Sequence, residues 1–216
     1  MAWKGGSPGS RKRVYVSIWD GTNWDDGTGS PYADVKDFGY TLDNNYRSFD
    51  AAFEPSGGDL LVVSGINTTN NLYYWTWNGS VWSSTGWGSI WNNNSVYRWC
   101  RLAPSSISDE IAFIGSSENG AVSAARWTGS GWTSTTTRTS SGGNIATDAI
   151  DIKYVQAGTY ADDIVAVWGQ GQYLYAAIYR NNLSSWAANT QVADLGSGNT
   201  VKWLKLKPQP DGDDLV

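Results

Sequence analysis

Three stretches of this sequence share the pattern W-x-G-x-x-W: WDGTNW (Trp19–Trp24), WNGSVW (Trp77–Trp82) and WTGSGW (Trp127–Trp132). A fourth, degraded copy, YRNNLSSW (Tyr179–Trp186), is two residues longer. The copies begin 58, 50 and 52 residues apart, so they recur at a nearly constant period. The glycine supplies the positive φ of a tight hairpin at little steric cost. Each copy therefore predicts a hairpin between two antiparallel strands.

Two further elements recur in phase with this motif. An acidic residue followed by an apolar run occurs at Asp59, Asp109, Asp163 and Asp214. Each acid follows an alternating run that reads as a strand and a turn: Phe49–Pro55, Trp99–Pro104, Ile150–Val155 and Val201–Pro208. Each repeat therefore predicts four antiparallel strands. Four strands recurring about every 52 residues are typical of a β-propeller blade, and helical periodicity is absent.

We therefore predict an all-β fold: a β-propeller of four four-stranded antiparallel blades in one domain, residues 1–216. The second, third and fourth blades are predicted at residues 48–97, 98–148 and 149–200. The first combines residues 201–216 with 1–47, because the last residues, DDLV, and the first, MAW, join to resemble DDIVAVW of the fourth repeat. Pairing of the N- and C-terminal segments in one blade would close the ring in a monomer. A homodimer sharing a larger ring, or a slice of a longer repeat array, are the alternatives.

Composition excludes several classes of function. The chain has 15 basic and 20 acidic residues and a net charge of -5, which speaks against a nucleic-acid partner. Histidine is absent, which excludes Ser-His-Asp catalysis and histidine-based metal sites, and the single cysteine excludes an intrachain disulfide. No apolar run approaches the length of a membrane span. The acids Asp20, Asp25 and Asp26 lack the spacing of a calcium loop, so we expect no metal and no cofactor.

Features that recur in every repeat are best explained by structure, and features that occur once are better candidates for function. The paired aromatic residues are expected to pack between blades, and the recurring acids to accept turn N–H groups. Trp75 and Arg126 stand where the other repeats carry different residue types, and Trp87 and Trp91 lie in a Gly/Ser/Asn-rich stretch that no packing rule requires. We predict these four residues as ligand-binding.

The W-x-G-x-x-W repeats resemble those of propellers in bacterial, archaeal and phage surface proteins, and are loosely similar to propeller lectins of the fucose-binding and tachylectin types. The Arg/Glu/Trp set of the fucose lectins is not matched blade by blade, so no sugar contact carries over. The resemblance implies a non-catalytic binding or adhesion module, extracellular or on a cell or virion surface, with a carbohydrate or a surface protein as partner. A purely structural repeat protein is one alternative. A glycosidase using acids such as Glu54, Glu110 and Glu118 is another.

Overall fold

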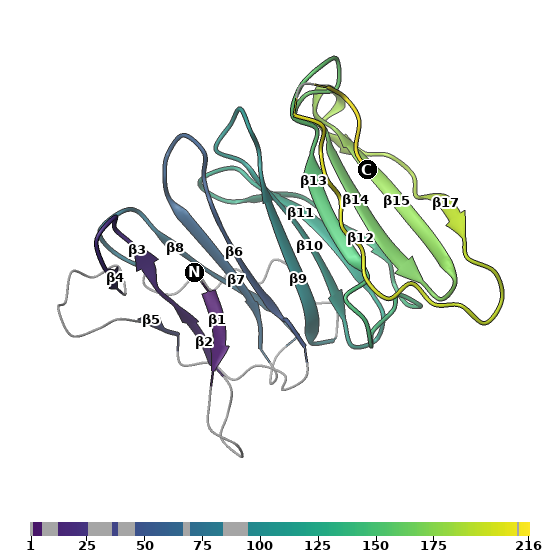
Figure 1. Cartoon of the computed structure of the whole chain (residues 1–216), viewed down its shortest axis with the longest axis horizontal. Coiled ribbons are helices and arrows are strands. Elements are labelled where there is room, and N and C mark those ends of the chain that lie inside the picture. Colours follow the sequence, from purple (N-terminus) through teal and green to yellow (C-terminus); the bar gives the residue numbers. More distant parts are fainter. Residues whose placement is uncertain are drawn as a thin grey trace.

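The computed structural model of the chain describes residues 2–5, 13–25, 36–38, 46–66, 70–83, 95–210 and 212–216. These residues form β-strands, one short 3-10 helix and no α-helix, so the all-β prediction is confirmed. The strands make antiparallel sheets that stand side by side in a row (Figure 1). Within the described ranges, no helix has the length and apolar character needed to span a membrane.

The described residues form five sheets, and with the two-stranded sheet of β3 and β4 counted together with sheet 1, four units follow one another in chain order. Sheet 1 contains β1 (Ala2–Gly5), β2 (Arg13–Val16) and β5 (Lys36–Asp37), and the hairpin of β3 (Ile18–Trp19) and β4 (Trp24–Asp25) continues it. Sheet 2 contains β6 (Phe49–Phe53), β7 (Leu60–Gly65) and β8 (Leu72–Trp77). Sheet 3 contains β9 (Tyr97–Pro104), β10 (Ile111–Ser117), β11 (Val122–Trp127) and β12 (Trp132–Thr139). Sheet 4 contains β13 (Ile150–Tyr154), β14 (Ile164–Gln170), β15 (Tyr173–Arg180), β16 (Ser185–Trp186) and β17 (Thr190–Asp194), with the 3-10 helix η1 (Asn181–Leu183) between β15 and β16.

The predicted hairpins are present at the W-x-G-x-x-W repeats. Gly21, Gly79 and Gly129 all adopt positive φ. The two aromatic residues of each repeat face each other across the hairpin, with ring centroids between 5.4 and 6.5 Å apart. The strands that lead into the second and third hairpins are β8 and β11, and each ends at the first tryptophan of its repeat.

The aromatic pairs of the second, third and fourth repeats pack against the preceding sheet of the row, whereas Trp19 and Trp24 of the first repeat are about half exposed. Trp127 and Trp132 of sheet 3 lie 5.3 and 5.9 Å from the ring of Tyr74 in sheet 2. Trp186 of sheet 4 donates its Nε1–H to the Ser134 carbonyl oxygen of sheet 3 at 2.8 Å. The three hydrophobic clusters each join two neighbouring sheets, so the core lies between sheets, and β7 and β10 are buried along their whole length.

The predicted closure of the ring is wrong in this structure. β1 pairs with β2, and residues 207–216 fold back on themselves, with hydrogen bonds between Lys207 and Val216. The C-terminal segment, residues 201–216, lies against sheet 4, where Trp203 bridges to Asp148. The two termini therefore sit at opposite ends of the row (Figure 1). The physical reason is that each segment pairs with residues close to it in sequence, β1 with β2 and Lys207 with Val216, and the described row does not curve far enough to bring its ends together.

Candidate functional site

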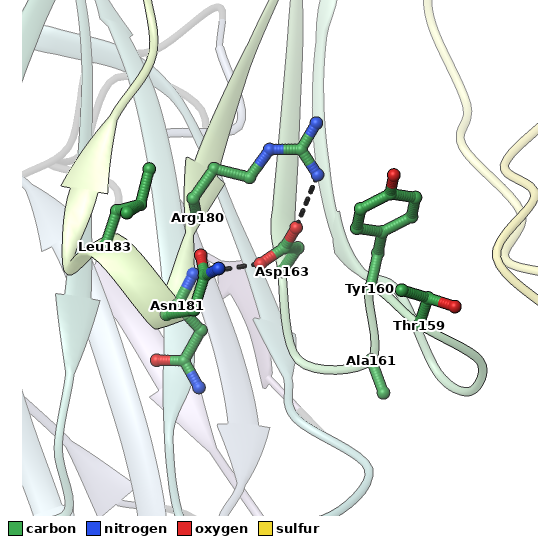
Figure 2. A pocket seen from close by; sticks show the side chains of 8 residues that line it. Thr159, Tyr160, Ala161, Asp163, Arg180, Asn181 and Leu183 are labelled. Atoms are coloured by element: carbon green, nitrogen blue, oxygen red, sulfur yellow. Dashed lines mark hydrogen bonds and ion pairs between the residues drawn. The ribbon is translucent and has the colours of Figure 1, made fainter.

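A pocket of about 540 Å³ opens at one end of sheet 4 (Figure 2). Its wall is formed by the loop between β13 and β14 and by the corner that follows β15. The lining residues are Thr159, Tyr160, Ala161, Asp163, Arg180, Asn181, Asn182 and Leu183. A volume of this size falls within the range of about 300–1,000 Å³ typical of small-molecule sites.

The loop between β13 and β14 is held from both sides. The Val155 N–H donates to the Asp163 carbonyl oxygen at 2.9 Å, and the Asp162 N–H donates to the Val155 carbonyl oxygen, also at 2.9 Å. The C-terminal segment contributes Asp213, whose carboxylate accepts the N–H groups of Thr159 and Tyr160 at 3.1 and 2.9 Å. These bonds place Tyr160 at the mouth of the pocket.

The centre of the pocket is an ion pair between Asp163 and Arg180. Arg180 Nη1 lies 2.7 Å from Asp163 Oδ2, and the second carboxylate oxygen accepts the backbone N–H of Asn181 at 2.9 Å. Asp163 is 5% exposed, whereas the Arg180 side chain is about one third exposed. The Arg180 guanidinium also lies 4.7 Å from the ring centroid of Tyr160, which is 50% exposed (Figure 2). A buried carboxylate thus orients a guanidinium and an aromatic ring that both reach solvent.

Behind the pocket, a polar network joins sheet 4 to sheet 3. Asn181 accepts a hydrogen bond from Arg126 at 3.1 Å and donates one to Asp162 at 3.2 Å. Arg126 also pairs with Glu110 at 3.2 Å. Asp162 accepts the Ser105 hydroxyl at 2.6 Å. These bonds hold the Asn181 side chain from two sides at the corner after β15.

Three carboxylates between sheets are less acidic than usual: Glu54, Glu110 and Asp162, here called the inter-sheet carboxylates. Burial is the main cause of the raised pKa of each of them. Hydrogen bonds or an opposite charge oppose the shift: the Trp127 indole at Glu54, Arg126 at Glu110 and the Ser105 hydroxyl at Asp162. Glu54 and Asp162 hold partners across a sheet interface, and Glu110 pairs with Arg126 of its own sheet, so the contacts of all three are those of structural groups.

Two acids near the turns, Asp109 and Asp213, bind N–H groups of a neighbouring turn rather than of their own turn. In sheet 2 the Glu54 N–H donates to the Asp59 carbonyl oxygen, and in sheet 3 the Ser105 N–H donates to the Glu110 carbonyl oxygen. The residue equivalent to Asp59 is therefore Glu110 and not Asp109. Asp109 instead accepts the N–H groups of Ser56 and Gly57 in the preceding sheet, at 2.8 and 2.7 Å. Asp213 does the same for the pocket loop. The carboxylates therefore bind turn N–H groups as expected, but from one sheet to the previous one.

The structure separates the residues predicted to bind ligand. Trp75 is 6% exposed and stacks on Phe38 with ring centroids 4.2 Å apart, so it has a packing role in the core between sheets 1 and 2. Arg126 lies in the network behind the pocket and covers the buried ring of Tyr179 at 5.0 Å. Trp87 and Trp91 lie outside the described residues. Trp75 and Arg126 thus belong to different interfaces and do not form one surface.

Apart from Asp163, which was predicted as a turn acid, the pocket residues were not predicted, although the sequence carries a signal for Arg180. The residue after the first aromatic of the repeat is Asp20, Asn78, Thr128 and Arg180 in the four copies, so the only basic residue stands in the degraded copy. The insertion in that copy supplies Asn182 and Leu183 to the wall. Tyr160 lies in a loop without a repeated pattern, and nothing in its neighbours singles it out.

No group of three or more metal-ligating side chains occurs in the described part of the chain. Of the acids considered for calcium, Asp20 accepts the N–H groups of Thr22 and Asn23 at 2.6 Å, which makes it a turn-stabilising group. Asp26 lies outside the described residues.

No model of a known protein family and no curated protein matches this chain. Among solved structures it is similar to a mutant of AofleA from Arthrobotrys oligospora, at 13% identity over 85% of this chain and 51% of that one, with a TM-score of 0.47. It is also similar to the NanB sialidase from Streptococcus pneumoniae, at 11% identity over 85% of this chain and 29% of that one (TM-score 0.49). The fucose-specific lectin from Aleuria aurantia matches at 15% identity over 89% of this chain and 77% of that one (TM-score 0.34). The chain spans about half or less of the length of the first two proteins. All three TM-scores are below 0.5, so these similarities do not establish the fold of this chain. The fold is defined by the strand pairings and the inter-sheet contacts described above.

Proposed function

We propose that the protein is a non-catalytic binding module that recognises a neutral carbohydrate in the pocket of sheet 4. The observation that carries this proposal is the ion pair of Arg180 with the buried Asp163 beside the half-exposed ring of Tyr160. Sugars present hydroxyl groups that both donate and accept hydrogen bonds, and a guanidinium, a carboxylate and asparagine amides complement them. The apolar face of a sugar ring packs well on an aromatic side chain.

The charge around the pocket favours a neutral ligand. Four carboxylates, those of Glu110, Asp162, Asp163 and Asp213, lie in the wall and in the network that supports it. Among the described residues, two guanidinium groups, those of Arg126 and Arg180, pair with these carboxylates. The excess of negative charge would repel a carboxylated or sulfated sugar.

The position of the acids supports binding without catalysis. Two-carboxylate glycoside hydrolysis requires a pair of carboxyl groups on either side of the scissile bond. Of the pocket-lining residues, Asp163 alone carries a carboxylate. Glu54 accepts the Trp127 indole, and Glu118 pairs with Arg98, so these two acids have other partners. The proposed setting is extracellular or on a cell or virion surface, where such a module would bind glycans.

The test is a glycan array followed by titration calorimetry with the strongest neutral hit. We expect Tyr160→Ala and Asn182→Ala each to weaken binding by about tenfold or more, which corresponds to about 1.4 kcal/mol. Tyr160→Phe keeps the ring and should retain most of the affinity. The matched control is Ser130→Ala, at the corresponding exposed corner of sheet 3, and it should bind like the natural sequence.

Three results would overturn the proposal. The first is an array with no neutral glycan above background, which is the result that a purely structural protein predicts. The second is binding confined to anionic glycans. The third is unchanged affinity of the Tyr160→Ala and Asn182→Ala variants for a confirmed ligand, which would place the binding site elsewhere.

A further inference from the structure

The side chain of Asn181 connects the pocket to a buried acid behind it. Arg126 Nη1 donates to Asn181 Oδ1 at 3.1 Å, and Asn181 Nδ2 donates to Asp162 Oδ2 at 3.2 Å. A guanidinium can only donate hydrogen bonds and an ionised carboxylate can only accept them, so these two partners fix which end of the amide carries the oxygen. Asn181 lines the pocket (Figure 2), whereas Asp162 lies behind the lining residues. The Asp162 carboxylate therefore acts on the pocket through this amide.

The other oxygen of Asp162 is committed as well. Asp162 Oδ1 accepts the Ser105 hydroxyl at 2.6 Å. That hydroxyl oxygen itself accepts the N–H groups of Ile107 and Ser108, both at 3.1 Å. Because a serine hydroxyl has one hydrogen and two lone pairs, its hydrogen points at Asp162. Both carboxylate oxygens thus face donors, and this arrangement is complete only while Asp162 is ionised.

The backbone at Asp162 adopts an uncommon conformation. Its φ is 68°, in the left-handed region that glycine, asparagine and aspartate adopt more readily than other residues. The residue is 7% exposed, and its N–H is bound by the Val155 carbonyl oxygen. The next residue, Asp163, lines the pocket and pairs with Arg180. Two adjacent acids therefore support the same wall, one from the pocket and one from behind it.

Asp162 differs from the acids around it because its partners are neutral. The titratable and charged groups that face it are Arg126 of β11, Glu110 before β10, Tyr154 of β13 and Asp163 of its own loop. Arg126 lies 3.2 Å from Glu110, and Arg180 lies 2.7 Å from Asp163. Within the described ranges, Asp162 forms no ion pair and is bound by a hydroxyl and an amide. A nearby cation favours the ionised form of the other two acids, so a proton taken up in mild acid goes to Asp162.

Protonation of Asp162 breaks the chain of hydrogen bonds. A proton on Oδ2 faces the Nδ2–H of Asn181, donor against donor, and a proton on Oδ1 meets the Ser105 hydrogen in the same way. If the Asn181 amide turns over to accept the proton, its Nδ2–H then faces Arg126, which also only donates. No orientation of the amide satisfies both neighbours once the acid is neutral. Ionised Asp162 therefore fixes this part of the wall, and protonated Asp162 releases it.

We propose that Asp162 is a positioning residue of the pocket: its ionised carboxylate orients the Asn181 amide toward a bound carbohydrate, and acid weakens binding by releasing that amide. Beyond its two bonds, the amide has one further N–H and one further lone pair for a sugar hydroxyl. The effect on affinity rests on the proposed function. The coupling between Asp162 and Asn181 is a property of the free protein and does not depend on any glycan.

Nuclear magnetic resonance of the free protein between pH 7 and pH 4 tests the coupling. We expect the side-chain amide signals of Asn181 to follow the titration of the Asp162 carboxyl carbon. In Asp162→Asn these signals should be displaced at pH 7 and should no longer titrate, while the backbone is kept because asparagine tolerates positive φ. The matched control is Asp109→Asn, which removes the acid at the equivalent position of sheet 3 and should leave the Asn181 titration unchanged.

Titration calorimetry with the neutral glycan selected by the array tests the effect on binding. The natural protein should bind about three- to tenfold more weakly at pH 4 than at pH 7, as expected for one lost hydrogen bond. Asp162→Asn should be weakened to a similar extent at pH 7 and should show little further change at pH 4. Asp109→Asn should retain both the affinity at pH 7 and the loss in acid.

An exchange of the two side chains, Asp162→Asn with Asn181→Asp, gives a rescue test. The amide at position 162 then accepts the Ser105 hydroxyl and donates to the carboxylate at position 181, which also accepts from Arg126. All the bonds of the chain are restored, so the exchange variant should recover part of the affinity at pH 7. It should hold that affinity at pH 4, because its carboxylate now pairs with Arg126.

The failure of this proposal is distinguishable from the failure of the proposed function. Asn181 amide signals that do not follow Asp162 would overturn the coupling, whatever the protein binds. Equal glycan affinity at pH 7 and pH 4 in the natural protein would overturn the positioning role while leaving the pocket as the binding site. A coupled titration of Asn181 in a protein that binds no glycan would refute the proposed function and support the coupling.

Discussion

The contact between Trp127 and Glu54 allows a sharp test of how the sheets are held together. The Trp127 Nε1–H of sheet 3 donates to Glu54 Oε1 of sheet 2 at 2.7 Å, and both residues are buried. The perturbation is Trp127→Phe, which keeps an aromatic ring and removes the donor. Trp132→Phe is the matched control, because the Trp132 ring also packs on Tyr74 while its Nε1 has no hydrogen-bond partner in the described structure.

The expected loss combines two effects. A hydrogen bond to a charged group contributes about 1.5–3 kcal/mol, and exchanging an indole for a phenyl ring in a packed interface costs about 1 kcal/mol more. At pH 7 we therefore expect Trp127→Phe to lower the free energy of unfolding by about 2.5–4 kcal/mol. The control should lose about 1 kcal/mol, because only packing changes.

The effect should depend on pH with a defined sign. Burial raises the pKa of Glu54 above its ordinary value near 4.5, and the Trp127 hydrogen bond opposes this shift. Removal of the indole therefore raises the pKa further. An acid whose pKa is raised on folding lowers the free energy of unfolding when it is ionised, and this penalty disappears once the acid is protonated in the folded and the unfolded state. The destabilisation caused by Trp127→Phe should therefore shrink as the pH falls toward 4.

Urea unfolding followed by tryptophan fluorescence at pH 7 and pH 4 measures both quantities. Glu54→Gln in the Trp127→Phe background removes the buried charge and should recover part of the loss at pH 7. Equal losses for Trp127→Phe and Trp132→Phe, or a loss that does not change with pH, would refute the assignment of Glu54 as a buried, indole-bound carboxylate.

Three further predictions concern packing and pH. Gly65→Ala would place a Cβ 2.5 Å from the Tyr97 carbonyl oxygen and should lower the free energy of unfolding by about 1–3 kcal/mol, whereas Gly131→Ala, with nothing within 4 Å, should change it by less than about 0.5 kcal/mol in urea titrations. Trp75→Ala should destabilise by about 3–5 kcal/mol and leave the glycan affinity of the folded fraction unchanged; selective loss of affinity would contradict its core position. Because the inter-sheet carboxylates have raised pKa values, replacing all three with their amides should stabilise more at pH 7 than at pH 4.5, as followed by thermal unfolding, and the opposite order would contradict burial as the cause.

The local structure of the repeat was predictable from the sequence. The hairpins were predictable from Gly21, Gly79 and Gly129, because residues other than glycine rarely adopt positive φ. The alternating runs predicted the strands β6, β9 and β13. The alternation of apolar residues along a strand and the residues of a turn are local properties of the sequence, so each repeat predicts its own strands and hairpin. The recurrence of the aromatic pairs predicted that they pack between sheets, which holds for the second, third and fourth pairs, while Trp19 and Trp24 are about half exposed.

Long-range arrangement was not predictable in the same way. Closure of the ring depends on the angle between successive sheets, which no local pattern encodes. The uniqueness of Trp75 among the repeats predicts a binding role, but a unique residue can equally fill a unique gap, here beside Phe38. The pocket combines Tyr160 from an irregular loop with Arg180 from a degraded hairpin, and only folding brings the two together.

The proposed binding site is tested most directly by nuclear magnetic resonance of the protein titrated with the neutral glycan selected by the array. The account predicts shifts concentrated at residues 159–163 and 180–183, including the Arg180 side chain, with the indole signals of Trp75 and Trp127 unchanged. Shifts centred on Trp19 and Trp24, or on the interface between sheets 2 and 3, with none at the sheet 4 pocket, would contradict it.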